Sequence, residues 1–321
     1  MLSAEEYTMP VVERFVSING EGPRAGRLAA FIRFAGCNLA CSWCDTAWAN
    51  VGNCEHESLT PAKLVEWVAG SGAACVTLTG GEPTLQPGLP ALIGALCQSE
   101  VWGLRGKLPR VVEVETNGAV DLAELAALRA ELEGAVGLGA LDADGACSSV
   151  VAVDSAAMAA ANADAVASTA MADAEAGVEA GVTGPGSANA KTSAADLGSA
   201  DANAGSATRK ACGLPTQVCF TVDCKMPSSG MTAEMLPSNY GLLRRGDAVK
   251  FVVASREDLE CALGVIEKHD LCSRCEVFFS PVFSCIEPSQ IVDFMQEHNL
   301  ANVRLQLQLH KIIWPGQEKG V

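Results

Sequence analysis

The sequence is poor in basic residues. Its 321 residues include 22 Lys and Arg against 38 Asp and Glu, so the formal net charge is −16 and the isoelectric point is about 4.6. A protein that binds the phosphate backbone of a nucleic acid normally presents a basic patch or stripe. The charge balance therefore predicts that no nucleic acid is a partner of this chain.

The chain also lacks the sequence features of an exported or membrane-bound protein. Its first residues, MLSAEEYTMP, are acidic where a signal peptide has a basic region and then an apolar run. No run of 18 uncharged apolar residues occurs, so no ordinary transmembrane helix is expected. In a reducing compartment its 14 cysteines are thiols that can serve as metal ligands. We predict a cytoplasmic protein without a membrane partner.

Aromatic residues are missing from the middle of the chain. None of the 16 Phe, Trp and Tyr lies between Trp102 and Phe220, and residues 134–208 consist mostly of Ala, Gly, Ser, Asp and Asn. That segment holds nine acids and one base, which is half of the net charge. It cannot bury enough apolar surface to offset its ordering entropy. We predict a disordered insertion at 134–208 in one interrupted domain, 1–133 and 209–321; a small ordered subdomain is the alternative.

Outside this segment, short β-branched runs alternate with stretches of helical periodicity. This alternation is typical of parallel βα units and predicts an α/β fold. The predicted strands are 29–34, 75–79, 111–115, 219–223, 248–253 and 276–280. The predicted helices are 61–69 behind Thr60, 88–99, 122–133, 256–269 behind Ser255, and 290–299. Six such strands fit a partial (βα)₆ barrel or an open doubly wound sheet, and in both folds ligands bind at the carboxyl ends of the strands.

A Cys-x₃-Cys-x₂-Cys motif, Cys37, Cys41 and Cys44, directly follows the first predicted strand. Structural zinc takes four protein ligands, so a trio leaves one position open. A [4Fe–4S] cluster held by three cysteines leaves one iron free for a small ligand. The spacing favours an iron–sulfur cluster, with a zinc site completed by a distant ligand and simple buried cysteines as the alternatives.

The second predicted strand runs into Thr79-Gly80-Gly81-Glu82-Pro83. Alone this is a strand-to-helix turn, in which glycines allow a close backbone approach because they lack a Cβ. After the cysteine trio, it resembles the Gly-Gly-Glu-Pro motif of the radical S-adenosylmethionine (SAM) superfamily. The resemblance implies a partial (βα)₆ barrel and a cluster on Cys37, Cys41 and Cys44, with the amine and carboxylate of SAM on the fourth iron. One electron then cleaves SAM to methionine and a 5′-deoxyadenosyl radical.

Within that superfamily the chain resembles the 7-carboxy-7-deazaguanine synthases. The matching stretches are FVSINGEG at 15–22, FIRF at 31–34 leading into CNLACSWCDT, EVETNG at 113–118, DCKMPSSGM at 223–231 and QLHK at 308–311. They cover 10–133 and 216–315. The chain departs from the family in the insertion, in Asn19 where Gln is commoner, and in residues 316–321 beyond the family's usual end.

This resemblance implies a lyase that converts 6-carboxy-5,6,7,8-tetrahydropterin to 7-carboxy-7-deazaguanine and ammonia in queuosine biosynthesis. It also implies Mg²⁺ on Thr46, a reductant protein of the flavodoxin or ferredoxin type, and a homodimer. Two other functions stay open at this point. One is a radical SAM activase that installs a glycyl radical on a partner protein, and the other is a non-catalytic iron–sulfur or zinc scaffold.

The resemblance also assigns site residues. The contacts to SAM fall on residues after the strands, which are Trp43, Cys44, Asp45, Gly81, Glu82, Glu115, Asp223, Cys224 and Lys225. The contacts to the pterin fall on Ile18, Asn19, Gly20, Glu21, Arg33, Thr79 and His310. The planar fork of Arg33 suits the substrate carboxylate, and His310, expected on a late strand, is a second candidate. For each carboxylate the alternative is a solvated charge, for Arg33 a surface ion pair, and for His310 a core histidine.

The remaining cysteines are expected to pack rather than to bind metal. Cys272 and Cys275 form a CxxC pair, with Cys261 and Cys285 nearby, but a lone pair is weak support for an auxiliary cluster. We predict structural roles for Cys54, Cys75, Cys97, Cys147, Cys212 and Cys219.

Overall fold

The computed structural model describes residues 7–99, 102, 110–136, 216–317 and 319–321. Most of the predicted insertion, with Cys147 and Cys212, therefore lies outside the described residues. The part of it that is described, residues 134–136, belongs to a helix that ends at Val136. Within the described ranges, no helix is both long enough and apolar enough to cross a membrane.

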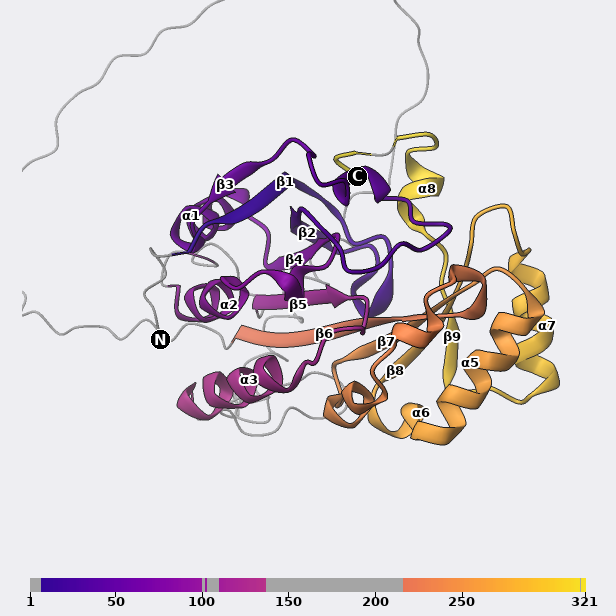
Figure 1. The fold of residues 1–321 in the computed structure, drawn as a ribbon. Coiled ribbons are helices and arrows are strands. Elements are labelled where there is room, and N and C mark those ends of the chain that lie inside the picture. Colours follow the sequence, from indigo (N-terminus) through magenta and orange to yellow (C-terminus); the bar gives the residue numbers. More distant parts are fainter. Residues whose placement is uncertain (1–6, 100–101, 103–109, 137–215, 318) are drawn as a thin grey trace, which may run out of the picture. The chain divides into compact units, whose positions relative to one another are not determined.

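One nine-stranded sheet organises the described chain (Figure 1), in the order β3-β1-β2-β4-β5-β6-β7-β8-β9. The six predicted strands are present as β2 (Leu28–Phe34), β4 (Cys75–Gly80), β5 (Arg110–Thr116), β6 (Thr216–Lys225), β7 (Ala248–Val253) and β8 (Glu276–Pro281), and they are parallel neighbours in this order. The sequence did not predict β1 (Met9–Ile18), β3 (Glu57–Leu59) or β9 (Val303–Leu305). β1 is antiparallel to β2 and β3, and β9 extends the parallel series. The α/β class is confirmed, and the sheet is open between β3 and β9.

The predicted helices are present with small shifts at their ends. They are α1 (Pro61–Ser71), α2 (Leu89–Gln98), α3 (Ala123–Val136), α5 (Arg256–His269) and α7 (Pro288–Glu297), with shorter helices α6 (Leu271–Arg274) and α8 (Leu309–Ile313). The hydroxyls of Thr60 and Ser255 accept hydrogen bonds from the first turns of α1 and α5, as N-cap residues do. α7 begins with a capping box in which Glu287 and Gln290 bond each other's backbone N–H.

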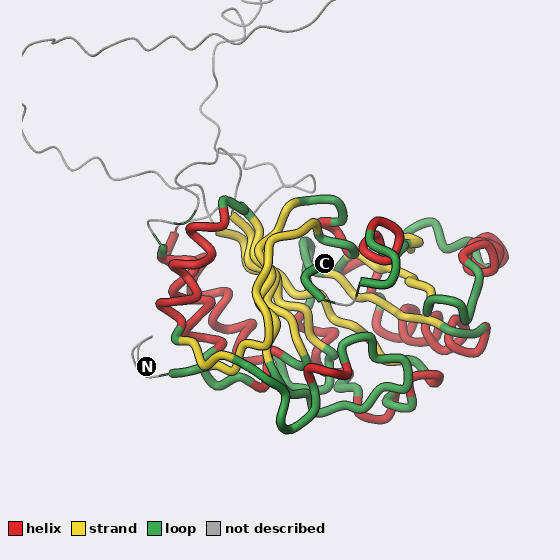
Figure 2. The backbone as a smooth tube through the Cα atoms, turned by 90° about the horizontal axis from the view of Figure 1, so that it is seen from above, coloured by secondary structure: helices red, strands yellow, loops and turns green. Residues whose placement is uncertain are grey.

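Side chains alternate along each strand, and this alternation divides the sheet into two faces. On β2, Ile32 and Phe34 are buried in the main core with side chains of the helices, among them Leu64 of α1 and Leu92 of α2. Figure 2 shows these helices and the strands as neighbouring layers. We call the opposite face, which Phe31 and Arg33 share, the inner face. Its small apolar cluster consists of Ala29, Phe31, Cys75, Val111 and Cys219, with Phe15 stacked on Phe31 at 4.9 Å.

A buried ion pair ties the loop between β1 and β2 to the inner face. Arg24 donates from Nε and Nη2 to the two carboxylate oxygens of Glu113 on β5, at 2.9 and 2.8 Å. Thr221 and Asn19 also donate to Glu113, at 2.6 and 3.1 Å. Burial alone would raise the pKa of Glu113, but Arg24 and these hydrogen bonds outweigh it and lower the pKa. Removing one partner of such a pair typically lowers the free energy of unfolding by about 3–5 kcal/mol. The loop, residues 19–27, is therefore fixed against the inner face, and we call it the floor loop.

The two strands that flank the predicted insertion are direct neighbours. β5 and β6 pair in parallel from Arg110 and Thr216 to Thr116 and Val222. The helix between them in sequence, α3, is held by Arg129, whose Nη1 lies 2.8 Å from the Asp247 carboxylate. The elements before and after the predicted insertion, α3 and β6, are therefore held in place by contacts between described residues.

We expect the insertion to be dispensable for folding. Replacement of residues 137–208 by a short Gly-Ser linker should yield protein whose melting temperature and circular dichroism match those of the full chain, because ladder pairing and the Arg129–Asp247 ion pair persist. Shortening a loop changes its closure entropy by only about 0.6 kcal/mol per halving. Insoluble protein, or a melting temperature far below that of the full chain, would contradict the single interrupted domain.

Candidate active site

The loop after β2 presents three partly buried free thiols, Cys37, Cys41 and Cys44. The backbone N–H of Leu39 and the side-chain amide of Asn117 point at the Cys37 sulfur, at 3.4 and 3.5 Å. Burial raises the pKa of Cys37 and of Cys41, and these N–H donors at Cys37 act in the opposite direction. N–H groups aimed at a ligand sulfur are among the features that tune iron–sulfur sites.

The donor set of this loop fits a three-cysteine iron–sulfur cluster. Soft thiolates are the usual ligands of such clusters, and all three come from one segment of eight residues at the end of a strand. Across the described ranges, no three His, Cys, Asp or Glu side chains gather closely enough to hold a single metal ion. A four-iron cluster is wider than one ion, so its three ligands need not meet at one point.

The Gly-Gly-Glu-Pro segment after β4 packs directly against the start of the loop that carries Cys37, Cys41 and Cys44, which we call the cysteine loop. Gly81 N–H donates to Phe34 and Glu82 N–H to Gly36, at 3.0 and 2.8 Å. A Cβ on Gly81 would overlap the carbonyl oxygen of Gly36, and one on Gly80, where φ is +139°, would overlap the backbone of Phe34. The two glycines are thus needed for a backbone-to-backbone contact, in addition to the approach of a ligand that the sequence predicted.

We expect Gly81→Ala to destabilise the protein by about 1–3 kcal/mol, because overpacking against backbone atoms forces the cysteine loop to shift. The measurement is chemical denaturation. A matched control is Gly94→Ala on α2, where a Cβ meets nothing within 4 Å. The control should gain about 0.5–1 kcal/mol, since Ala favours helix over Gly. Equal stability of Gly81→Ala and the wild type would refute the close contact.

Glu82 connects the ends of β4 and β5. Its side chain is fully buried, Oε1 accepts from Thr84 and Thr116, and Oε2 accepts from the backbone N–H of Asn117 at 2.7 Å. Burial raises the pKa of Glu82, and these hydrogen bonds oppose the rise. The carboxylate therefore orients Asn117, whose amide reaches Cys37. The sequence predicted a contact between Glu82 and SAM and did not predict this role.

The predicted SAM residues of β6 divide between the two faces of the strand. Asp223 and Lys225 form an ion pair of 2.8 Å, and Nζ of Lys225 lies 5.4 Å from the ring centroid of Trp43 in the cysteine loop. Cys224 points the other way into the main core, where its sulfur lies 2.9 Å from the Tyr240 hydroxyl. The Cys224 side chain therefore faces away from those of Asp223 and Lys225, because successive residues of a strand face opposite sides. The predicted contact of Cys224 with SAM stays a prediction.

The segment after β6 also holds the cysteine loop in place. Ser42 donates from its backbone N–H to Ser229 and from its hydroxyl to the Ser228 carbonyl, at 3.1 and 2.6 Å. The indole N–H of Trp43 donates to the Ser228 hydroxyl at 3.2 Å. Two motifs that lie more than 180 residues apart in the chain thus form one structural unit.

The carboxyl group of Glu115 on β5 has an unusually high pKa. Burial, together with the nearby carboxylates of Glu113 and Glu21, raises its pKa to about 7, and the charge of Lys250 opposes that rise. Perturbed carboxyl groups of this kind cluster at functional sites, because a group that titrates near neutrality can take up or release a proton during turnover.

Arg33 lies on the inner face of β2, beside Thr79 of β4 in the parallel register. Its Nε donates to Oε1 of Glu13 on β1 at 2.7 Å, and both side chains are largely buried. Among the described residues, no hydrogen-bond acceptor is recorded for its two terminal nitrogens. Glu13 therefore orients the guanidinium and leaves its fork free. The sequence missed Glu13 because it missed β1.

Glu21, from the floor loop, is bound by side chains of β7 and β8 and of the residue that follows β9. Nζ of Lys250 lies 2.7 Å from Oε2, while Ser280 and Gln306 donate to Oε1 at 3.1 and 3.4 Å. Burial alone would raise the pKa of Glu21, but the charge and hydrogen bond of Lys250 outweigh burial and lower it to about 2. Sequence reasoning missed Lys250, although it is the one charged residue of the predicted strand 248–253.

Two of the predicted substrate residues, Asn19 and His310, lie in surroundings that the sequence did not predict. Asn19 has both backbone groups engaged, since its N–H donates to Arg27 and its carbonyl accepts from Gly26, each at 2.8 Å. Its N–H is therefore engaged within the loop, and its carbonyl keeps one lone pair as an acceptor. His310 lies on α8, not on a strand, and its Nδ1 would be 2.6 Å from a Cβ on Gly20. Burial lowers the pKa of His310, so this ring is neutral at neutral pH.

The remaining predicted site residues lie in the floor loop, at its start, or in the cysteine loop. Ile18 ends β1, and Gly20 accepts a hydrogen bond from the N–H of Leu309 at 3.1 Å. Thr46, the predicted magnesium residue, has its hydroxyl 3.7 Å from the Cys44 sulfur. Asp45 lies 3.6 Å from Nζ of Lys311 on α8. Helix α8 therefore contacts both the floor loop and the cysteine loop.

The cysteines of the CxxC pair contact backbone carbonyls. The Cys275 sulfur is buried and lies 3.6 Å from the Leu271 carbonyl, and the Cys272 sulfur lies 3.9 Å from that of Asn302. The cysteines predicted to be structural, Cys75 and Cys219, belong to the apolar cluster of the inner face.

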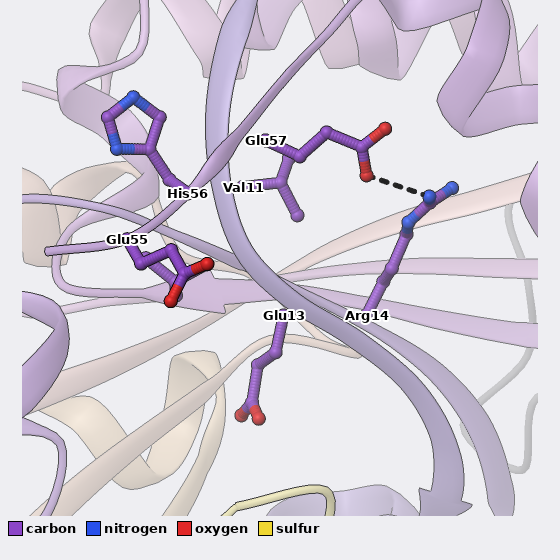
Figure 3. A pocket seen from close by; sticks show the side chains of 7 residues that line it. Val11, Glu13, Arg14, Glu55, His56 and Glu57 are labelled. Carbon is purple, nitrogen blue, oxygen red and sulfur yellow. Dashed lines mark hydrogen bonds and ion pairs between the residues drawn. The ribbon is translucent and has the colours of Figure 1, made fainter.

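Two surface cavities lie away from the cysteine loop. One of about 370 Å³ borders β1 and β3 and is lined by residues 11–14 and 55–57. Figure 3 shows the Arg14–Glu57 ion pair of this cavity, with the side chain of Glu13 pointing away from that ion pair. The other, of about 230 Å³, includes Cys224, Tyr240 and Cys261 beside α5. Neither cavity is lined by Cys37, Cys41 or Cys44. We therefore define the candidate site by the cysteine loop and the polar residues of the inner face, and not by a cavity.

Comparison with known proteins agrees with this geometry. Residues 31–142 match the family model described as the radical SAM superfamily. The chain is 33% identical to the 7-carboxy-7-deazaguanine synthase of Clostridium acetobutylicum over 311 residues, covering 97% of this chain and 98% of that protein. It is 27% identical to the synthase of Chlorobaculum tepidum, covering 98% of this chain and 99% of that protein.

A solved structure shares the fold. The crystal structure of QueE from Escherichia coli aligns over 95% of this chain and 96% of that chain, with a TM-score of 0.53 and 15% sequence identity. With a one-third identity that spans nearly the whole of both proteins, the Clostridium match shows that this chain belongs to the 7-carboxy-7-deazaguanine synthase family of the radical SAM superfamily.

Proposed function

We propose that this chain converts 6-carboxy-5,6,7,8-tetrahydropterin to 7-carboxy-7-deazaguanine and ammonia, as a lyase of queuosine biosynthesis. One observation carries the proposal: the inner face combines a cation with a free fork, Arg33, and an ionised carboxylate, Glu21, beside a three-cysteine loop. The substrate has a matching pair of features, a carboxylate at one end and an amino-bearing ring edge at the other. The family membership of the chain supports the same reaction.

In the proposed complex the terminal nitrogens of Arg33 bind the substrate carboxylate. Glu13 keeps the guanidinium plane fixed, so less side-chain freedom is lost on binding. Glu21 accepts hydrogen bonds from the amino edge of the pterin, and Thr79 lies beside Arg33 in the register. The neutral His310 ring and the backbone at Ile18 and Gly20 complete this side.

Cys37, Cys41 and Cys44 would hold the [4Fe–4S] cluster. When bound, the cluster and SAM supply the radical that removes a hydrogen atom from the substrate. Trp43, Asp45 and the backbone of Gly81 would contact SAM on the side of the cluster. On the inner face, Glu115 would bind the ribose hydroxyls and Asp223 would close the pocket. Lys225 connects these groups, since it pairs with Asp223 and lies over Trp43. Mg²⁺ on the Thr46 hydroxyl belongs to the same proposal.

Two elements would exclude water from the substrate on the inner face. The floor loop closes the inner face through the Arg24–Glu113 ion pair, and α8 bridges the floor loop and the cysteine loop. Exclusion of water protects reactive intermediates from side reactions. A one-electron donor of the flavodoxin or ferredoxin type and a homodimer complete the proposal, both on the ground of family resemblance.

The decisive experiment is an anaerobic assay with reconstituted protein, a reductant, SAM and the carboxytetrahydropterin. We expect 7-carboxy-7-deazaguanine and ammonia in equal amounts, identified by mass spectrometry. Cleavage of SAM without this product would favour a glycyl-radical activase, and the absence of any SAM cleavage would favour a scaffold. Either result would refute the proposed reaction.

A further inference from the structure

Lys250 lies at the centre of the polar part of the inner face. It is on β7, where its Cα is the register partner of Asp223 on β6, and its side chain is 12% exposed. Its Nζ contacts Glu21 at 2.7 Å and lies 3.7 Å from the Asp223 carboxylate. This single ammonium therefore bridges a predicted substrate residue and a predicted SAM residue.

The charges around Lys250 come from several elements. Glu21 of the floor loop, Glu115 of β5 and Asp223 of β6 are acidic, and their charges raise the pKa of Lys250 well above its usual value against the effect of burial. Two further titratable groups face it, Lys225 of β6 and His310 of α8. Lys225 is paired with Asp223 at 2.8 Å, and the pKa of His310 is lowered by burial, so neither replaces Lys250 as the cation on Glu21.

We propose that Lys250 is a positioning residue that keeps Glu21 as a hydrogen-bond acceptor for the amino edge of the pterin and joins it, through Asp223, to the SAM side of the site. The inference rests on the proposed function. Its physical basis is that a buried carboxylate without a cation takes up a proton. A protonated Glu21 would present an O–H donor to a ring edge that itself carries donors.

The sign of the pH effect follows from these contacts. With Lys250 present the pKa of Glu21 is about 2, so substrate binding does not depend on Glu21 titration near neutral pH. Without the ammonium, burial raises the pKa of Glu21, and Ser280 and Gln306 supply only neutral hydrogen bonds. The dissociation constant of the pterin should then rise as the pH falls.

The test is the dissociation constant of 6-carboxy-5,6,7,8-tetrahydropterin, measured by anaerobic calorimetry on cluster-reconstituted protein without reductant, so that no turnover occurs. We expect Lys250→Met to weaken binding about 10- to 100-fold at neutral pH, with a further loss at lower pH. Lys250→Arg keeps the charge and should retain the pH profile of the wild type. The double variant Lys250→Met with Glu21→Gln should lose the pH dependence that Lys250→Met adds and that Glu21→Gln alone does not show, because residue 21 can no longer titrate.

The matched control is Arg129→Met, which removes the cation of a buried ion pair with Asp247 on the helix side of the sheet. It should lower the melting temperature without changing the pH profile of binding. If Lys250→Met fails to fold, the double variant, which leaves no unpaired charge at position 21, is compared with Glu21→Gln alone. In that comparison the two should bind equally, since Lys250 acts through Glu21.

Three results would overturn the inference. They are wild-type affinity of Lys250→Met at all pH values, a loss of affinity that does not vary with pH, and a Lys250→Arg variant as weak as Lys250→Met. Failure of the wild-type protein to bind the pterin is a different outcome, because it would refute the proposed substrate and the role of Lys250 with it.

Discussion

Replacement of Cys37, Cys41 or Cys44 by Ala is expected to abolish the visible absorbance of the iron–sulfur cluster in anaerobically reconstituted protein, and all turnover with it. The three thiols are the free soft donors of one loop, and loss of any one leaves a cluster with two protein ligands. The measurements are the absorption spectrum, the iron and sulfide content, and product formation.

A neighbouring thiol provides the control for the cysteine variants. Cys54 lies shortly after the loop, and its sulfur contacts the Ala49 carbonyl at 3.4 Å. Cys54→Ala should keep the full iron content and activity. A variant in which all three of Cys37, Cys41 and Cys44 are Ala, yet which retains iron and turnover, would rule out radical SAM chemistry at this loop.

The second large effect is expected at Arg33. Arg33→Ala should lower kcat/KM by about 30- to 1000-fold, which corresponds to roughly 2–4 kcal/mol, because a charge-assisted pair with the substrate carboxylate is lost. Arg33→Lys keeps the charge but loses the planar fork, so it should lie between Arg33→Ala and the wild type. Steady-state kinetics with the carboxytetrahydropterin measures both variants.

Arg14 is a suitable control for Arg33. It lies on β1 next to Glu13 in sequence, and it pairs with Glu57 at 2.9 Å in the surface cavity. Arg14→Ala should leave kcat/KM near the wild-type value. In the Arg33 variants the cluster spectrum and the cleavage of SAM without substrate should persist, because Arg33 is not a ligand. Near-normal turnover by Arg33→Ala would remove Arg33 from the site and would favour the activase.

The sequence predicted the strands whose two faces are both largely buried, because such strands are continuous apolar runs. The apolar runs of β7 and β8 follow this rule, and the predicted bounds match the structure within one residue. β1 has a mixed sequence, MPVVERFVSI, because Glu13 faces the inner side and Arg14 the outer edge. A strand with charges on both faces shows neither alternation nor an apolar run, and β3 and β9 are too short to show a period.

The candidate site was predictable in its local parts. The three cysteines, the two glycines and Glu82 lie in short segments, and the resemblance of these segments to the motifs of the radical SAM superfamily predicted their roles. The direction of the Cys224 side chain was not predictable, because a motif does not say which face of a strand each residue occupies. Asn117 was not assigned a role because its contact with Cys37 crosses from β5 to β2.

The sequence by itself determined the α/β class. Through the family resemblance it also predicted three cysteines as cluster ligands, and Arg33 and Glu21 as contacts of one substrate. Only the tertiary structure decided how the charges pair: Glu13 with Arg33, Lys250 with Glu21 and Asp223, and Glu82 with Asn117. The physical reason is that the partner of a side chain on a sheet depends on strand order, register and the entry of loops from other parts of the chain. These contacts join residues 20 to 229 positions apart, and no local pattern of residue types records them.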